Sequence, residues 1–114
     1  MIIVVAKIRF ENQADRDRAV ELSAPVQHAT RVEEAGCHDY CFSADPCDGN
    51  IIQVYELWQD SDSLAAHFEH PNYFDMVEVF REARFVESVN RCYLTERDEP
   101  VYGPEGEKKT AFFT

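Results

Sequence analysis

The order in which apolar patterns follow one another most limits what this chain of 114 residues can fold into. Four segments show the alternation of apolar residues that is typical of strands: residues 2–10, 37–44, 51–59 and 85–95. Three others repeat apolar residues every three or four positions, as helices do: residues 13–35, 62–69 and 72–84. The order strand, helix, strand, strand, helix pair, strand predicts an α+β fold, a ferredoxin-like antiparallel sheet covered by helices on one face.

Local signals predict where the helices begin and end, and which side they bury. Asn12 and Asp60 are expected to cap two of the helices, and Pro71 to stand in the first turn of the last one. Gly36 stands where a left-handed glycine ends the helix over 13–35. Two buried stripes are expected: Ala19, Leu22, Val26, Ala29 and Val32 on the first helix, and Tyr73, Val77 and Phe80 on the last.

Both faces of the predicted strands carry apolar or aromatic side chains. Val4 and Ile8 fall on one face of the first strand, whereas Ile3 and Val5 fall on the other. A sheet of this kind cannot leave one face in water, and a second copy is its simplest cover. We therefore expect a homodimer in which two sheets pack face to face as a dimeric α+β barrel.

The end of the chain differs from the rest in composition. Residues 98–114 hold four of the nine proline and glycine residues. Residues 1–97 are therefore expected to form the barrel domain, and residues 98–114 a C-terminal tail, loop or partner-docking arm.

Composition excludes several classes of partner. The 22 acidic residues outnumber the 11 basic ones, which gives a net charge of −11 that would repel nucleic acids and anionic membranes. The first residues lack the basic segment of a signal peptide, and no apolar run approaches the roughly 20 residues that cross a bilayer. We expect a cytoplasmic protein with no membrane partner. Its cysteines are expected to be free thiols that hold no metal: Cys37, Cys41, Cys47 and Cys92.

Three motifs make the sequence similar to a known family. The run from Glu34 through Gly36 and Cys37 to Tyr40 resembles the ExGCxxY junction of the antibiotic biosynthesis monooxygenases. Glu56-Leu57-Trp58 resembles the ExW motif of that family, and Leu64 to Pro71 resembles its LxxHxxxP helix break. The resemblance covers about residues 2–95. It implies a dimeric α+β barrel with a pocket between the helices and the sheet of each subunit.

The resemblance also implies a chemistry that uses neither flavin nor metal. Small quinol or polyphenolic aromatic substrates act as their own reductant toward dioxygen, so that the protein supplies a base, an apolar pocket and hydrogen-bond donors. Two alternatives remain open for this chain. One is an isomerase or lyase that uses the same base without oxygen, and the other is a non-catalytic ligand-binding dimer.

The resemblance suggests roles for six residues. His67 matches the family histidine and is the candidate base, although a structural histidine at a helix end fits its spacing equally well. Glu56 is expected to orient His67 or a substrate hydroxyl, or else to be held by a backbone amide or an arginine. The expected substrate-binding residues are Trp58 as a flat wall, Tyr40, Asn72 and Tyr73.

One position departs from the family pattern. Many relatives carry a histidine directly after the proline of the helix break, where this chain has Asn72 after Pro71. An amide is no base, so a mechanism that needs a second histidine there would have to use His70.

Overall fold

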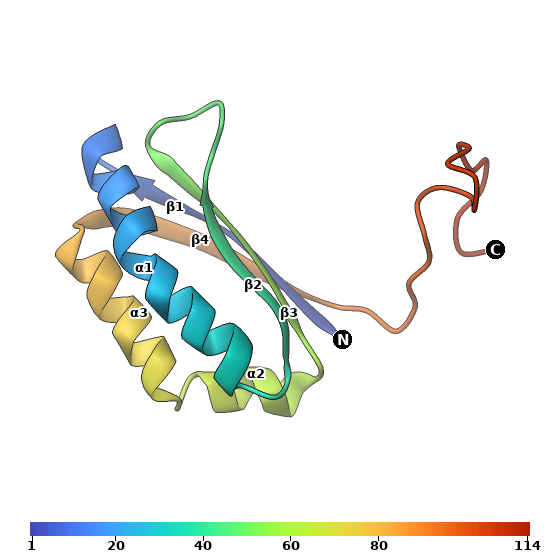
Figure 1. The fold of residues 1–114 in the computed structure, drawn as a ribbon, viewed down its shortest axis with the longest axis horizontal. Helices are drawn as coiled ribbons and strands as arrows, with labels where there is room; N and C mark the ends of the chain where they lie inside the picture. Colours follow the sequence, from blue (N-terminus) through green and yellow to red (C-terminus); the bar gives the residue numbers. More distant parts are fainter.

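The computed structural model describes residues 1–114 and confirms the predicted fold. Its elements are β1 (Ile2–Phe10), α1 (Gln13–Glu33), β2 (Cys37–Ala44), β3 (Ile51–Trp58), α2 (Ser61–His67), α3 (Pro71–Glu82) and β4 (Phe85–Leu94). The strands form one antiparallel sheet in the order β2-β3-β1-β4. Helices α1 and α3 lie side by side over one face of this sheet, and α2 lies across its end (Figure 1). The opposite face carries no helix.

The register of the sheet decides which side chains meet the helices. Ala6 of β1 lies opposite both Val54 of β3 and Asn90 of β4, and residues that lie opposite each other share a face. The face toward the helices therefore carries the largest buried side chains of the sheet, Phe10, Tyr40, Ile52 and Trp58. Glu56 lies among them and is buried, because the alternation in β3 places it on the same face as Trp58.

Polar side chains at the helix starts confirm the predicted boundaries. The Asn12 side chain accepts a hydrogen bond from the backbone N–H of Asp15 at 2.8 Å, which caps α1. The Asp60 side chain caps α2 in the same way, through the N–H of Ser63 at 2.8 Å. Pro71 stands in the first turn of α3, as expected.

The predicted buried stripe of α1 is wrong at two of its five positions, whereas Ala19 is buried and Val26 and Ala29 are partly buried. Leu22 and Val32 are exposed, whereas the buried residues are Arg16, Ala19, Ser23, Gln27 and Thr30. Gln27 explains why polar residues lie inside. Its amide bonds both backbone groups of Phe42, at 2.9 Å to the N–H and 3.1 Å to the carbonyl. β2 is an edge strand, so these backbone groups have no strand partner on that side, and α1 provides one.

The stripe of α3 is shifted rather than absent. Phe80 is buried as predicted, but Met76 is buried with it, while Tyr73 and Val77 are only partly covered. These last two side chains border a cavity, so that they face the sheet without being packed against it.

The left-handed end predicted for α1 at Gly36 is also wrong. The helix ends through an extended Glu34, and Gly36 does not have a positive φ. Glycine is needed there for a different reason. A Cβ atom at Gly36 would lie 2.1 Å from Ser63 Oγ and 2.4 Å from Ser63 Cβ. The chain between α1 and β2 therefore passes directly against the first turn of α2.

Replacing Gly36 with alanine is expected to lower the free energy of unfolding by about 1–3 kcal/mol, because the new methyl group overlaps Ser63. The second substitution Ser63→Gly removes both overlapping atoms and should recover most of that loss, measured by urea unfolding. Ser63→Gly alone is the control for the helix propensity of glycine. If the double variant is as unstable as the two single losses added together, the contact does not explain the glycine.

No helix of this chain combines the length and the apolarity needed to cross a membrane.

Candidate functional site

A cavity of about 560 Å³ lies between the sheet and the helices α2 and α3. Its volume is in the range of small-molecule sites. Apolar side chains of the two helices form one wall, among them Leu64, Met76 and Phe80. Four polar residues predicted for the site also line it: Tyr40, Glu56, His67 and Tyr73. The structure therefore brings together most of the predicted site residues in a largely apolar cavity.

Trp58 lies behind the cavity rather than in its wall. Its side chain is fully buried, and its ring centroid lies 4.7 Å from that of His67. The indole N–H donates to Glu56 Oε1 at 2.9 Å. The direct substrate contact predicted for Trp58 is therefore not seen, because the ring is covered by His67 and supports it from behind.

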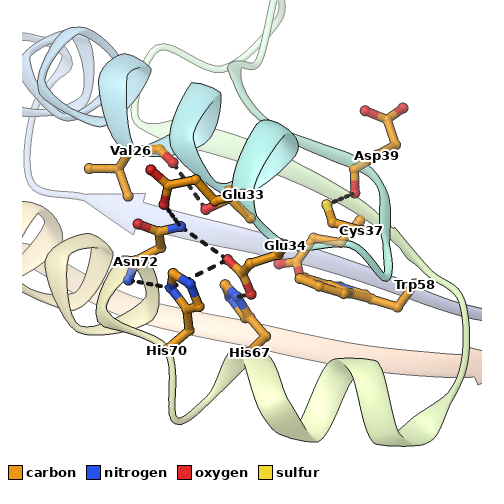
Figure 2. A network of polar contacts seen from close by, with 11 residues as sticks. Val26, Glu33, Glu34, Cys37, Asp39, Trp58, His67, His70 and Asn72 are labelled. Atoms are coloured by element: carbon orange, nitrogen blue, oxygen red, sulfur yellow. Dashed lines mark hydrogen bonds and ion pairs between the residues drawn. The ribbon is translucent and has the colours of Figure 1, made fainter.

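His67 is held by Glu34, an acid of the ExGCxxY motif that was not predicted as a site residue. His67 Nδ1 lies 2.8 Å from Glu34 Oε1, and both side chains are almost fully buried (Figure 2). When Nδ1 carries the proton and donates it to Glu34, Nε2 keeps a free lone pair. Nε2 of His67 has no hydrogen-bond partner in the protein. Every buried polar side-chain atom of the chain does have a partner, so Nε2 is not a buried atom. Because His67 lines the cavity, Nε2 is open to it.

Glu56 makes no hydrogen bond to His67, and Glu34 is the acid that orients this ring. The pairing joins residues 33 positions apart: Glu34 is the C-cap residue of α1, and His67 is the last residue of α2. A buried carboxylate on one ring nitrogen fixes the ring and makes the other nitrogen a better acceptor.

Asn72 belongs to the support of this pair and does not line the cavity. Its amide nitrogen donates to Glu33 Oε2 at 3.1 Å and to Glu34 Oε2 at 3.3 Å (Figure 2). The substrate contact predicted for Asn72 is therefore replaced by a contact to the two acids, because the side chain points from the start of α3 toward the end of α1.

His70 is the N-cap of α3 and has no place in the cavity. Its Nδ1 accepts a hydrogen bond from the backbone N–H of Asn72 at 3.1 Å. Because that lone pair is occupied, the approach of Nδ1 to Glu34 Oε2 at 3.9 Å is proximity and not a hydrogen bond. Of the two histidines at the helix break, His67 is the one that faces the cavity.

Glu56 is an unusual acid for an apolar cavity. Its pKa is raised to about 7, mainly by burial. The hydrogen bond from Trp58 lowers this pKa, and the nearby charge of Glu34 raises it. A carboxyl group with such a pKa exists in both protonation states at neutral pH and can act as a proton donor or acceptor. Glu56 thereby gives the cavity a second titratable group beside His67.

Tyr40 supplies a hydrogen-bond donor. Burial raises the pKa of its phenol above the usual value, and the neighbouring acids Glu56 and Glu34 raise it further. The hydroxyl therefore keeps its proton at neutral pH and can donate to an oxygen of a bound molecule.

The β4 side of the cavity carries polar residues that were not predicted for the site. Ser88 and Asn90 lie on the face toward the helices, and Arg91 borders both the cavity and a shallow depression on the other face of the sheet. Strand alternation places Ser88 and Asn90 on one face of β4. Their polar character was the signal in the sequence that this strand does not pack into the core, and every residue of β4 is exposed.

Comparisons with known proteins agree with this architecture. The family model for antibiotic biosynthesis monooxygenases matches residues 1–79. A provisionally assigned member from Deinococcus radiodurans superposes with a TM-score of 0.77 at 17% identity, over 90% of this chain and 100% of the other. A conserved protein of Methanosarcina mazei superposes with a TM-score of 0.70 at 24% identity, over 81% of this chain and 89% of the other. A protein of unknown function from Bacteroides thetaiotaomicron superposes with a TM-score of 0.70 at 22% identity, over 81% of this chain and 94% of the other.

The sequence matches no curated protein. At these identities the structural likeness shows the fold, whereas the family model matches well over half of the chain. The chain therefore belongs to the antibiotic biosynthesis monooxygenase family.

Proposed function

We propose that this protein is a cofactor-independent monooxygenase that oxidises a small quinol or polyphenolic aromatic with dioxygen. Family membership supports a general monooxygenase-like function. The observation that carries the finer proposal is the buried Glu34–His67 pair, with the free ring nitrogen of His67 open to a largely apolar cavity. Such a pair supplies the proton acceptor that this chemistry needs, in a cavity whose walls are mostly apolar.

The proposed reaction begins when His67 Nε2 removes a phenolic proton. The resulting anion gives one electron to dioxygen, and the two radicals combine at a ring carbon that bears hydrogen, which forms a hydroperoxide. Loss of water from this carbon leaves a quinone carbonyl, so that one oxygen atom stays in the product and the other leaves as water. The substrate supplies all the electrons.

Two other cavity residues suit these steps. The Tyr40 hydroxyl keeps its proton and stabilises the substrate anion by donating to its oxygen. Glu56, with a pKa of about 7, donates a proton to the departing hydroxide.

We further propose that two copies pack through the helix-free face of the sheet as a homodimer. The family is typically oligomeric. Apolar side chains on that face are exposed in the single chain, including Tyr55, Val89 and Tyr93. A second copy would cover them, as expected from strands that are apolar on both faces.

The proposed function predicts oxygen uptake with a panel of naphthohydroquinones and without added flavin or metal. Uptake should match quinone formation mole for mole above the rate of autoxidation, and ¹⁸O₂ should place one labelled atom in the product. The measurement uses an oxygen electrode and mass spectrometry. A panel that reacts no faster with the protein than without it would count against the proposal.

Two further outcomes would identify the alternatives. Exchange of a substrate C–H proton with solvent, without oxygen uptake, would indicate an isomerase or lyase that uses His67 and Glu56 as its acid–base pair. A ligand that raises the Tm and undergoes no reaction would indicate a binding protein.

A further inference from the structure

The C-terminal arm, residues 96–114, leaves the domain at a fixed point. Thr95 and Met1 exchange two backbone hydrogen bonds, of 2.9 Å from Thr95 N and 3.1 Å from the N-terminal amine, which hold the end of β4 beside the start of β1. Beyond Thr95 the chain extends away from the sheet and helices and folds back on itself at a distance from them (Figure 1). The radius of gyration is 16.0 Å, compared with about 13 Å for a compact domain of this length.

The arm has a defined local structure. An isolated bridge joins Tyr102 and Lys108, and Gly103 N donates to the carbonyl of Glu107 at 2.9 Å. At the base of this hairpin Lys109 Nζ lies 3.1 Å from Glu99 Oε2. The arm therefore closes an ion pair of its own at the base of its hairpin.

Two cations of the arm also position its terminal aromatic rings. Lys109 Nζ lies 5.1 Å from the ring centroid of Phe112, and the Arg97 guanidinium lies 5.5 Å from that of Phe113. The rings are thus oriented by contacts within the arm rather than by a core.

Four large apolar side chains of the arm are exposed: Val101 at 63%, Tyr102 at 60%, Phe112 at 50% and Phe113 at 49%. A segment far below about 40 residues cannot bury such side chains in a core of its own. Each aromatic ring would bury roughly 150–250 Å² if it were covered. An arm of this composition is stabilised by docking on another surface.

We propose that the arm crosses to a second copy of this chain and packs these four side chains on the body of that copy. This inference rests on the proposed homodimer. Val89 and Tyr93 are exposed on the helix-free face of β4, and the arm begins directly after this strand, so a copy packed on that face lies next to the point where the arm leaves. Reciprocal exchange of two arms about a two-fold axis gives a closed dimer in which neither arm stays exposed.

Photo-cross-linking of the full chain tests this directly. The probe p-benzoylphenylalanine replaces Phe112, and light chains are refolded together with ¹⁵N-labelled heavy chains. Arm exchange predicts cross-linked peptides that join one light and one heavy segment, with the arm of one chain attached to the body of the other. The same probe in place of Glu21, which is exposed on α1, is the control for random collision and should give no mixed products.

The second measurement is the dimer dissociation constant by analytical ultracentrifugation. The double variant Phe112→Ser/Phe113→Ser should weaken the dimer at least tenfold, because hot-spot aromatics are removed. Glu105→Ser, at the exposed turn of the arm, should leave the constant unchanged. A stable dimer with only same-label cross-links and an unchanged constant would overturn the arm exchange alone. A monomeric full chain would overturn both the exchange and the proposed dimer.

Discussion

Replacing His67 with alanine is expected to lower oxygen uptake at least 100-fold, since general-base catalysis by a positioned side chain contributes about 10²–10⁴-fold. The expected loss lies in kcat more than in KM, because the cavity walls that hold the substrate are unchanged. Added imidazole should restore part of the rate, because it can enter the space that the side chain leaves. Oxygen-electrode kinetics with and without imidazole measure both effects.

The controls separate the base from a structural histidine. His67→Ala leaves the buried Glu34 carboxylate without its partner, which costs stability. His67→Gln restores a donor to Glu34 without a base, so it should fold more stably and remain equally inactive. His28→Ala, on the exposed side of α1, should keep full activity. Activity of His67→Gln within threefold of the native rate would refute the assignment of the base.

The fold could be predicted because its signals are local. Asn12, Asp60 and Pro71 mark helix starts by contacts within one turn, so the chain around each of them is sufficient to place a boundary. The period of two in β3 likewise places Glu56 and Trp58 on one face without knowledge of any other strand.

The buried face of α1 could not be predicted from the helix alone. Gln27 is inside because an edge strand presents the backbone of Phe42 to it. Arg16 is inside because it donates to two carbonyls, at 3.1 Å to Asp48 in the loop after β2 and at 2.9 Å to Ile51 at the start of β3. A hydrophobic periodicity ranks both residues as exposed. Their burial depends on partners that only the tertiary structure brings near.

The candidate site likewise contains residues that local patterns could predict and residues that they could not. His67 could be assigned from its helix and its resemblance to a motif, and it does face the cavity. Glu34 stood in another of the motifs, but its role depends on how the end of α1 meets the end of α2, which no local pattern encodes. The prediction for Asn72 lacked the same information, because its partners are Glu33, at the end of α1, and Glu34, the C-cap residue of that helix.

The pH dependence of stability provides the second strong test, because Glu56 is buried with a pKa of about 7 against an ordinary value of 4.5. Between these two values the folded chain holds a proton that the unfolded chain has released. The contribution of Glu56 to the free energy of unfolding therefore falls as the pH rises from 4.5 to 7, and it stays low above 7. For a shift of this size the loss is up to about 3 kcal/mol.

Glu56→Gln removes this titration and keeps an oxygen that accepts from the Trp58 indole. Relative to the native chain, the variant should gain up to about 3 kcal/mol at pH 8 and little or nothing at pH 5, measured by urea unfolding at fixed protein concentration. Groups distant from Glu56 titrate equally in both chains, so they cancel in the difference. Glu21→Gln, an exposed acid on α1, should show no such pH-dependent gain. If native chain and Glu56→Gln lose stability in parallel from pH 5 to pH 8, the carboxyl is already ionised in the folded cavity and cannot donate a proton there at neutral pH.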